Sequence, residues 1–372
     1  MHVRIVRLFF LVLLVVASPA VLQAFASTGD FGIFEEQGDV GTVLHPGSAR
    51  YDATRKTYAI NGSGENMWFG KDDFHFLWKK VSGNIALTAD VSFVGTTGDK
   101  HRKAVLIFRQ SLDAGSPSVD IARHGDGLTS LQYRDMPGVD THEVESNISA
   151  PARVRIEKRG DFIYVYVSDP AGNLRPAGAS TKLKLTGEFY VGLGVCSHDK
   201  DAMETAVFSN VKLETLPDAS SKPVLYSTLE TVTIASTDRR VAYVVPRHFE
   251  APNWSPDGAF LLFNQDGSMQ RLNVGGTEPT LLPTGSNIKC NNDHGISHDG
   301  RMLAISDQSA AIGQSQVYVV PISGGTPRQV TTKAPSYFTA GRRTAKLWPS
   351  PGSGMASSIS IQFHSRAAVR RS

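Results

Sequence analysis

The chain has 372 residues and a formal net charge of +3. Two arginines near the N-terminus and six Lys or Arg residues within 339–372 carry that excess, so residues 27–338 have a net charge of −5. A mildly acidic main part gives no basis for a nucleic-acid partner, which would need a basic surface. The length suits two domains of ordinary size.

The first 26 residues have the features of a secretion signal. Two arginines precede an apolar run, Leu8–Ala17, which is too short to span a bilayer. Ala24–Ala26 has the small-residue spacing of a cleavage site. We expect residues 1–26 to be a signal peptide and the mature chain to be periplasmic or secreted, with no transmembrane segment after cleavage. An uncleaved N-terminal anchor is the alternative.

Residues 28–215 consist of short strand-like segments separated by Gly and Asp turns. Ile85–Phe93 alternates apolar with polar or small residues, and Ala104–Phe108 is a continuous apolar run. Val154–Val167 contains two apolar segments joined by a turn at 158–161, which indicates a hairpin. No convincing amphipathic helix appears. The pattern predicts an all-β sandwich or barrel.

Five segments of this region resemble a concanavalin/laminin-G-like jelly roll, three near its start and two near its end. They are GSGENMWF at 62–69, DDFHFLWKK at 72–80, SGNIALTADV at 82–91, YVGLGVCSH at 190–198 and AVFSNVKL at 206–213. The resemblance implies a jelly-roll β-sandwich over residues 28–215.

Jelly-roll domains of this kind often bind carbohydrate on a concave sheet face, and the resemblance implies the same here. Aromatic rings stack on the C–H faces of sugars, while Arg and Gln side chains bond the hydroxyls. The alternative is that the two tryptophans of this region, Trp68 and Trp78, belong to the core. The candidate ligand-binding residues are Trp68, Trp78, His124, Gln132, Tyr133 and Arg134.

Three smaller features of the chain restrict its chemistry. The sequence His-Gly-Asp-Gly at 124–127 suits a plain turn better than a calcium loop. No strand of the type E-x-D-x-E is present, which disfavours glycoside hydrolysis. The two cysteines, Cys196 and Cys290, lie in different predicted domains, and we expect buried free thiols rather than a disulfide.

A repeat of 42 residues follows a Pro/Ser/Asp linker at 216–223. W-S-P-D-G at Trp254–Gly258 returns as I-S-H-D-G at Ile296–Gly300, and an apolar strand follows each copy. Asp-Gly turns join hairpins because Gly accepts a positive φ, and this period is typical of a four-stranded propeller blade. The pattern closely resembles the TolB-like, or WD40-like, β-propeller repeat. The resemblance implies an incomplete β-propeller of two to three blades over 224–338.

A third copy is missing where the repeat predicts one. The family pattern after Phe338 would read H-G-W-S-P-D-G-K-T-L-A-F, whereas the chain reads T-A-G-R-R-T-A-K-L-W-P-S. Deletion of one base after the Phe338 codon changes a set of codons for the expected sequence into codons for the observed sequence. We therefore expect residues 339–372 to be out-of-frame translation and disordered. A genuine basic tail is the alternative.

Several polar residues of the repeats occupy positions that converge near the channel of a propeller. A cluster of His, Asp and Glu side chains can hold a divalent metal or a polar ligand, and related lyase-type propellers use channel histidines for a metal. The alternative is that these side chains bond backbone between blades. The candidate channel residues are His248, Glu250, Asn292, Asp293 and His294.

Two functions follow from these observations. The first is a non-catalytic exported binding protein, with a TolB-like propeller scaffold and a carbohydrate or protein ligand. The second is a metal-dependent, lyase-like propeller enzyme that acts on a polysaccharide and carries a sugar-binding module. The first accounts for more of the chain and is preferred.

Overall fold

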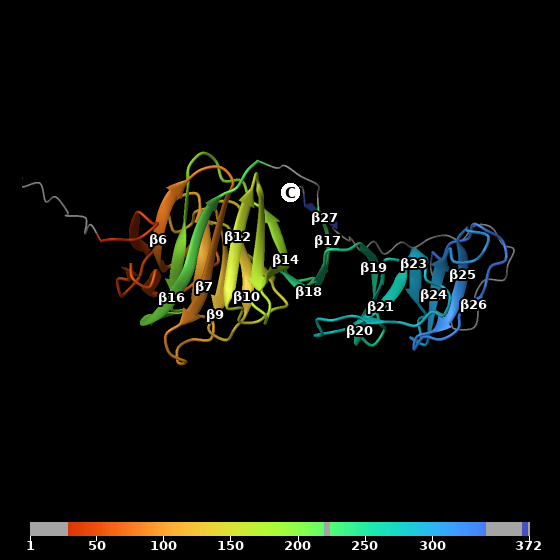
Figure 1. The fold of residues 1–372 in the computed structure, drawn as a ribbon. Coiled ribbons are helices and arrows are strands. Elements are labelled where there is room, and N and C mark those ends of the chain that lie inside the picture. Colours follow the sequence, from red (N-terminus) through yellow and green to blue (C-terminus); the bar gives the residue numbers. More distant parts are fainter. Residues whose placement is uncertain (1–28, 219–223, 340–366, 371–372) are drawn as a thin grey trace, which may run out of the picture. The chain divides into compact units, whose positions relative to one another are not determined.

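The computed structural model describes residues 29–218, 224–339 and 367–370 (Figure 1). All regular elements in these ranges are strands, so the expectation of an all-β chain that begins with a β-sandwich is confirmed. The described residues contain no helix with the length and apolarity needed to cross a membrane. The predicted signal peptide, most of the predicted linker and most of the predicted tail lie outside the described residues.

The larger sheet of the sandwich has ten strands in the order β1-β6-β15-β8-β9-β10-β11-β18-β17-β27. Their bounds are β1 Glu36–Val40, β6 Phe74–Val81, β15 Phe189–Cys196, β8 Lys103–Arg109, β9 Ser118–His124, β10 Thr129–Arg134, β11 His142–Glu145, β18 Arg239–Val245, β17 Val224–Val232 and β27 Ala367–Arg370. The short strand β27 lies within the tail, where we expected no regular structure. It pairs with the edge of β17, whose backbone groups would otherwise lack partners.

The smaller sheet has seven strands in the order β14-β13-β12-β7-β16-β3-β2. Their bounds are β14 Leu174–Lys182, β13 Phe162–Ser168, β12 Arg153–Arg159, β7 Ile85–Phe93, β16 Asp199–Thr215, β3 Thr57–Gly64 and β2 Ser48–Asp52. The predicted hairpin is formed by β12 and β13. A separate two-stranded ribbon, β4 (Met67–Trp68) and β5 (Lys71–Asp72), links β3 to β6.

The main core lies between the two sheets. The alternating residues of β7, from Ile85 to Val91, point into it. The continuous apolar run of β8 has a different cause, because this strand is buried on both faces. Leu106 and Phe108 face the main core, whereas Val105 and Ile107 belong to a second cluster on the outer face of the ten-stranded sheet.

Two glycines of β15 make room for that outer cluster. A Cβ at Gly194 would lie 2.7 Å from the ring of Phe74, and a Cβ at Gly192 would lie 2.0 Å from the Leu77 carbonyl oxygen and 2.8 Å from the ring of Phe76. All three spacings are closer than real Cβ contacts, so the backbone and the aromatic rings of β6 require a strand without side chains beside them.

The β17–β18 hairpin joins the ten-stranded sheet rather than either repeat. Strand β18 pairs in parallel with β11, with Val144 opposite Arg239. Val241 is buried in the main core of the sandwich. On the same hairpin, Leu229 packs in a cluster with Phe249 of the first repeat. The hairpin therefore shares apolar contacts with the sandwich and with the first repeat.

The two repeats each form a four-stranded antiparallel sheet. The first contains β19 Phe249–Trp254, β20 Phe260–Gln265, β21 Ser268–Asn273 and β22 Thr280–Leu281. The second contains β23 Cys290–Ile296, β24 Met302–Asp307, β25 Gln316–Pro321 and β26 Arg328–Gln329. Both first strands carry a register shift, and each sheet has the strand content that the repeat predicts for one blade.

The turn between the first two strands is the same in both repeats. The Ser255 Oγ accepts a bond from the Phe260 amide at 3.0 Å, and the Ser297 Oγ accepts one from the Met302 amide at 2.9 Å. Gly258 and Gly300 both have φ of 72°. The Ser and Gly residues that the two copies of the repeat share are therefore the residues that form the turn.

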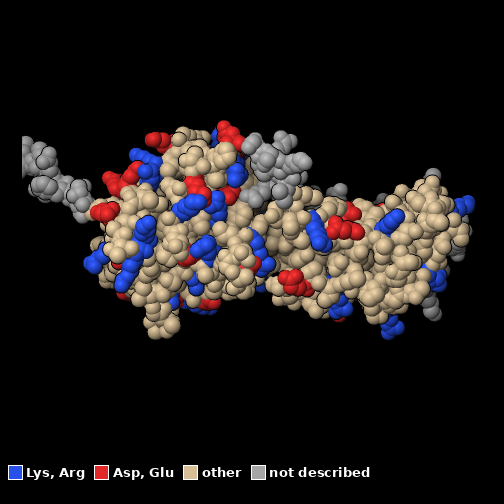
Figure 2. Space-filling model, viewed as in Figure 1, with Lys and Arg blue, Asp and Glu red and all other residues tan. Residues whose placement is uncertain are grey.

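Two further features of the described chain are its surface charges and its cysteines. On the face that Figure 2 shows, basic and acidic side chains are interspersed. Cys196 and Cys290 are both buried and free, as expected.

Candidate functional site

The outer face of the ten-stranded sheet carries a row of polar side chains. Strand registers place Asp120 of β9 opposite Gln132 of β10, and Gln132 opposite Glu143 of β11. The side chain of Gln132 donates to the Glu143 Oε1 at 3.1 Å. Two of the predicted residues, His124 and Gln132, therefore lie on the same face with a neighbour, Asp120, that the sequence analysis did not single out.

Asp120 is the most unusual residue of this row. Its side chain is only 5% exposed, and its Oδ1 has no hydrogen-bond partner. Burial raises the pKa of this carboxyl to about 8. The Gln132 Oε1 beside it is also buried without a partner. The sequence signal for Asp120 was its place between the apolar residues Val119 and Ile121, which puts it on the opposite face of the strand from them.

His124 lies at one end of the row as a neutral imidazole. Burial lowers the pKa of His124 to about 3, and its Nδ1 lies 3.1 Å from the Leu128 carbonyl oxygen. Asp126 accepts a bond from the Leu128 amide at 2.9 Å, so the His-Gly-Asp-Gly segment has the bonds of a turn. The His101 ring lies beside His124, with 6.2 Å between ring centroids.

Arg134 has a different role from the one predicted. It is buried, and its guanidinium bonds Asp72 of β5 at 2.8 Å and the Phe69 carbonyl oxygen at 2.9 Å. Arg109 contacts the same carboxylate. Burial alone would raise the pKa of Asp72, but the Arg109 charge and the bonds from Arg134 hold it below its usual range. These bonds fasten the β4–β5 ribbon to the end of the outer face.

The other end of the ribbon is fastened by Lys103. Its Nζ donates to the Asn66 Oδ1 at 3.0 Å and to the Met67 carbonyl oxygen at 2.8 Å. The same ammonium lies 5.2 Å from the centroid of the Trp68 ring, and burial lowers the pKa of Lys103. Trp68 is half-buried and lies on the ribbon, so the ribbon crosses the face that we expected to be open.

Trp78 and Tyr133 are packing residues. The Trp78 ring is buried in the outer apolar cluster and lies 5.4 Å from the Phe76 ring. Tyr133 is half-buried against the main core, on the opposite face of β10 from Gln132. The core interpretation of Trp78 is thus the one that agrees with its contacts.

The predicted channel residues of the repeats are only partly brought together. His248 is exposed, and its Nε2 lies 3.7 Å from the Glu250 carboxylate. Asn292 is exposed, Asp293 is half-buried, and burial raises the pKa of Asp293. Among the residues that the structure describes, no group of three His, Cys, Asp or Glu side chains has the geometry to hold a metal ion.

His294 is the buried member of this set. Burial lowers its pKa to about 4, while the backbone groups of Asn291 and Ala251 near the ring act in the opposite direction. The Glu250 Oε1 accepts a bond from the Asn264 amide at 3.3 Å, and the same amide donates to the Cys290 carbonyl oxygen at 2.8 Å. Glu250 is therefore connected to the second repeat through Asn264, which is not among the predicted channel residues.

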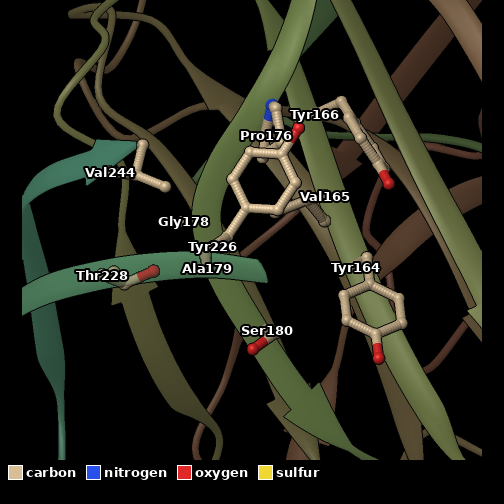
Figure 3. Close-up of a pocket in the computed structure, with 10 residues that line it drawn as sticks. All are labelled: Tyr164, Val165, Tyr166, Pro176, Gly178, Ala179, Ser180, Tyr226, Thr228 and Val244. Atoms are coloured by element: carbon tan, nitrogen blue, oxygen red, sulfur yellow. The ribbon is translucent and has the colours of Figure 1, made fainter. Parts of the chain in front are cut away.

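A small cavity of about 40 Å³ lies between the smaller sheet and the β17–β18 hairpin. Figure 3 shows its lining, with Tyr164 and Tyr166 extending from β13 and Tyr226 from β17. The volume admits a few water molecules but not a drug-sized ligand. It is a packing gap and not a candidate site.

Comparison with known proteins finds similarity over part of the chain. No family model matches it. An uncharacterized protein of Agrobacterium fabrum is 44% identical over 130 residues, which are 35% of this chain and 43% of the relative. A solved structure of a TolB-like protein from Agrobacterium tumefaciens is 46% identical, with 30% of this chain and 41% of that chain covered and a TM-score of 0.29.

The chain thus spans less than half the length of the curated relative that it matches. A family 7 alginate lyase is 10% identical over 48% of this chain and 93% of that chain, with a TM-score of 0.32. Part of the chain is therefore similar to these two Agrobacterium proteins.

Proposed function

We propose that this chain is an exported binding protein in which the β-sandwich holds a carbohydrate and the repeats belong to a TolB-like propeller scaffold. The row of buried polar side chains on the outer face supports this proposal. Asp120 and Gln132 each keep an acceptor atom without a partner, and a buried acceptor of this kind is costly unless a donor reaches it. Sugar hydroxyl groups are donors that suit both atoms.

The β4–β5 ribbon determines how the ligand would reach this row. Because Lys103 and Arg134 fasten the ribbon at its two ends, the proposal requires either entry from the β11 side or movement of the ribbon. Glu143, which is half-buried, lies at the β11 side and bonds Gln132. We therefore place the entrance beside Glu143.

Glycan-array binding of the full chain tests the function. Wild-type protein should bind at least one glycan class, and Gln132→Ala should reduce that binding at least tenfold. Asp140→Ala, a change at an exposed residue, is the control and should bind as wild type does. Equal binding by wild type and Gln132→Ala would show that the outer face is not where the glycan binds.

The second candidate function, a metal-dependent polysaccharide-active enzyme, is favoured by one observation. His294 is the buried imidazole of the predicted channel set, and an imidazole nitrogen is a common metal ligand. Metal analysis of the purified protein decides between the candidates. Stoichiometric manganese, calcium or zinc that is lost in His294→Ala would support the enzyme, and a metal-free protein would count against it.

We also propose that the mature protein is exported and that residues 339–372 arise from a shift of reading frame. The basic and apolar start of the chain and the codon relation after Phe338 support these two statements. N-terminal sequencing of exported material should begin at Ser27. Resequencing of the gene should find, after the Phe338 codon, one base more than the printed amino-acid sequence implies. A gene that reads as printed, with no further repeat in the other frame, would contradict the shift.

A further inference from the structure

A second cavity, of about 440 Å³, lies where three parts of the described chain meet. Its walls come from the segment that follows β11, from the β17–β18 hairpin and from the first repeat. The volume falls within the range of about 300–1,000 Å³ that is typical of small-molecule sites. None of the residues predicted from the sequence lines it.

Specific bonds hold two of the walls together. Arg240 of the hairpin forms an ion pair of 2.5 Å with Glu145 at the end of β11, and both line the cavity. The Asn147 side chain donates to the Ala242 carbonyl oxygen at 3.2 Å. Val241, between Arg240 and Ala242, is buried in the sandwich core. This wall is therefore built by pairing and packing, and not by loose surface loops.

The third wall presents an aromatic ring. Trp254, the first letter of the W-S-P-D-G motif, lines the cavity and is 44% exposed. Its counterpart in the second repeat, Ile296, packs against the apolar cluster that the two repeat sheets share. The same position of the repeat therefore serves packing in one copy and lines a cavity in the other. Leu272 and Val274 of the first repeat also line the cavity.

Polar groups converge on the same space. The Asn147 Oδ1 is buried without a hydrogen-bond partner, although the amide nitrogen of that side chain is bonded. Glu145 and Arg240 compensate each other's charge. An aromatic ring, an unpartnered acceptor and a neutral ion pair match the needs of an uncharged polyhydroxylated ring, whose C–H face stacks while its hydroxyls donate and accept.

We propose that this cavity binds a neutral saccharide, with one sugar ring stacked on Trp254 and its hydroxyls bonded to polar side chains of the lining, Asn147 among them. The site uses residues other than Asp120 and Gln132, so it stands or fails independently of the binding proposed for the outer face. A charged ligand would have to break the Glu145–Arg240 pair, which makes an acidic saccharide the poorer occupant.

Titration of the full chain with three neutral probes, cellohexaose, laminarihexaose and maltohexaose, tests the proposal by calorimetry and tryptophan fluorescence. At least one probe should bind saturably and change the fluorescence. Trp254→Ala and Asn147→Ala should each weaken that binding at least tenfold. Tyr337→Ala, which removes an exposed aromatic ring outside the cavity, is the matched control and should bind as wild type does.

The variants separate the two binding proposals. Binding that is lost in Trp254→Ala and kept in Gln132→Ala locates the saccharide in the cavity. Binding that is lost only in Gln132→Ala, or no saturable binding of any of the three probes, overturns the cavity proposal. Trp254→Phe, which keeps an aromatic face, should retain most of the affinity, and a loss as large as that of Trp254→Ala would argue against stacking.

Discussion

At the scale of single residues, the sandwich contains two buried carboxyl groups whose surroundings shift their pKa values in opposite directions. Asp72 has two arginine partners and is kept ionised, whereas Asp120 has no hydrogen-bond partner on its Oδ1 and keeps its proton to high pH. The first carboxylate fastens the β4–β5 ribbon. The second carboxyl, that of Asp120 on the outer face, can both donate and accept a hydrogen bond. Their different environments separate structural from functional candidates better than residue type does.

The Asp72–Arg134 pair should be important for stability. Arg134→Ala leaves a buried carboxylate with Arg109 alone, and we expect a loss of about 3 kcal/mol in the free energy of unfolding. Chemical denaturation measures it. Arg55→Ala breaks an exposed pair of 3.9 Å with Asp52 and should change the free energy by less than about 0.5 kcal/mol. Similar losses in both variants would contradict the argument.

The raised pKa of Asp120 predicts a pH dependence of stability. In the unfolded chain this carboxyl ionises near pH 4, whereas in the folded chain it keeps its proton to about pH 8. The folded state is therefore increasingly disfavoured as pH rises from about 4 to 8, with no further change above. Asp120→Asn removes this effect, so the variant should gain stability relative to wild type across that range.

Denaturation of both proteins at several pH values measures the difference. Asp140→Asn, a change at an exposed residue, is the control and should leave the pH profile unchanged. If the difference between Asp120→Asn and wild type stays constant from pH 4 to 8, Asp120 is ionised in the folded protein.

At the scale of elements, the repeat is defined by its turn. The serine and glycine residues occupy matched positions in both copies and have matched bonds and dihedral angles, although Pro256 in the first copy is replaced by His298 in the second. A sequence period thus reports local backbone geometry directly. It does not report what a repeated position contacts, as Trp254 and Ile296 show.

Gly258 tests this dependence on turn geometry. Its φ is 72° and a Cβ would meet nothing within 4 Å, so a substitution there is opposed by backbone strain alone. Gly258→Ala should cost about 1 kcal/mol of unfolding free energy. Gly258→Asn should cost less, because Asn tolerates the left-handed region. Thermal unfolding of the two variants gives the comparison, and equal losses would point to a cause other than φ.

At the scale of the whole molecule, the β17–β18 hairpin is the element that the sandwich and the first repeat share. Val241 enters the sandwich core, while Leu229 packs with Phe249 and Phe263 of the repeat. The cavity of about 440 Å³ lies against this hairpin. Binding there would be sensitive to how firmly the hairpin is held.

Val241→Ala measures that attachment. Loss of two buried methyl groups should destabilise the protein by about 2 kcal/mol and speed hydrogen exchange of the amides in β17 and β18. Val232→Ala, on the same hairpin but with an exposed side chain, is the matched control. Unchanged exchange in Val241→Ala would show that the hairpin is held by its backbone pairing with β11 alone.

Much of the fold was accessible to prediction from the sequence, because it depends on short-range patterns. Alternation in Ile85–Val91 identified a strand with one buried face, and the Asp-Gly turns identified the repeats. The apolar run at Ala104–Phe108 identified a strand but not its second buried face. The site was less accessible. His124 and Gln132 lie on the expected face, whereas Trp78, Tyr133 and Arg134 pack or form ion pairs.

The sequence by itself determined the strands, the turns and the period of the repeat, since each is set by neighbours within a few residues. The tertiary structure alone decided which polar groups remain without partners. The Asp120 Oδ1 lacks a partner because β8 and β10 place Ile107 and Gln132 opposite Asp120. Arg134 already has a partner because the ribbon brings Asp72, 62 residues earlier in the chain, to it. Partners of this kind come from distant segments, so only the folded chain specifies them.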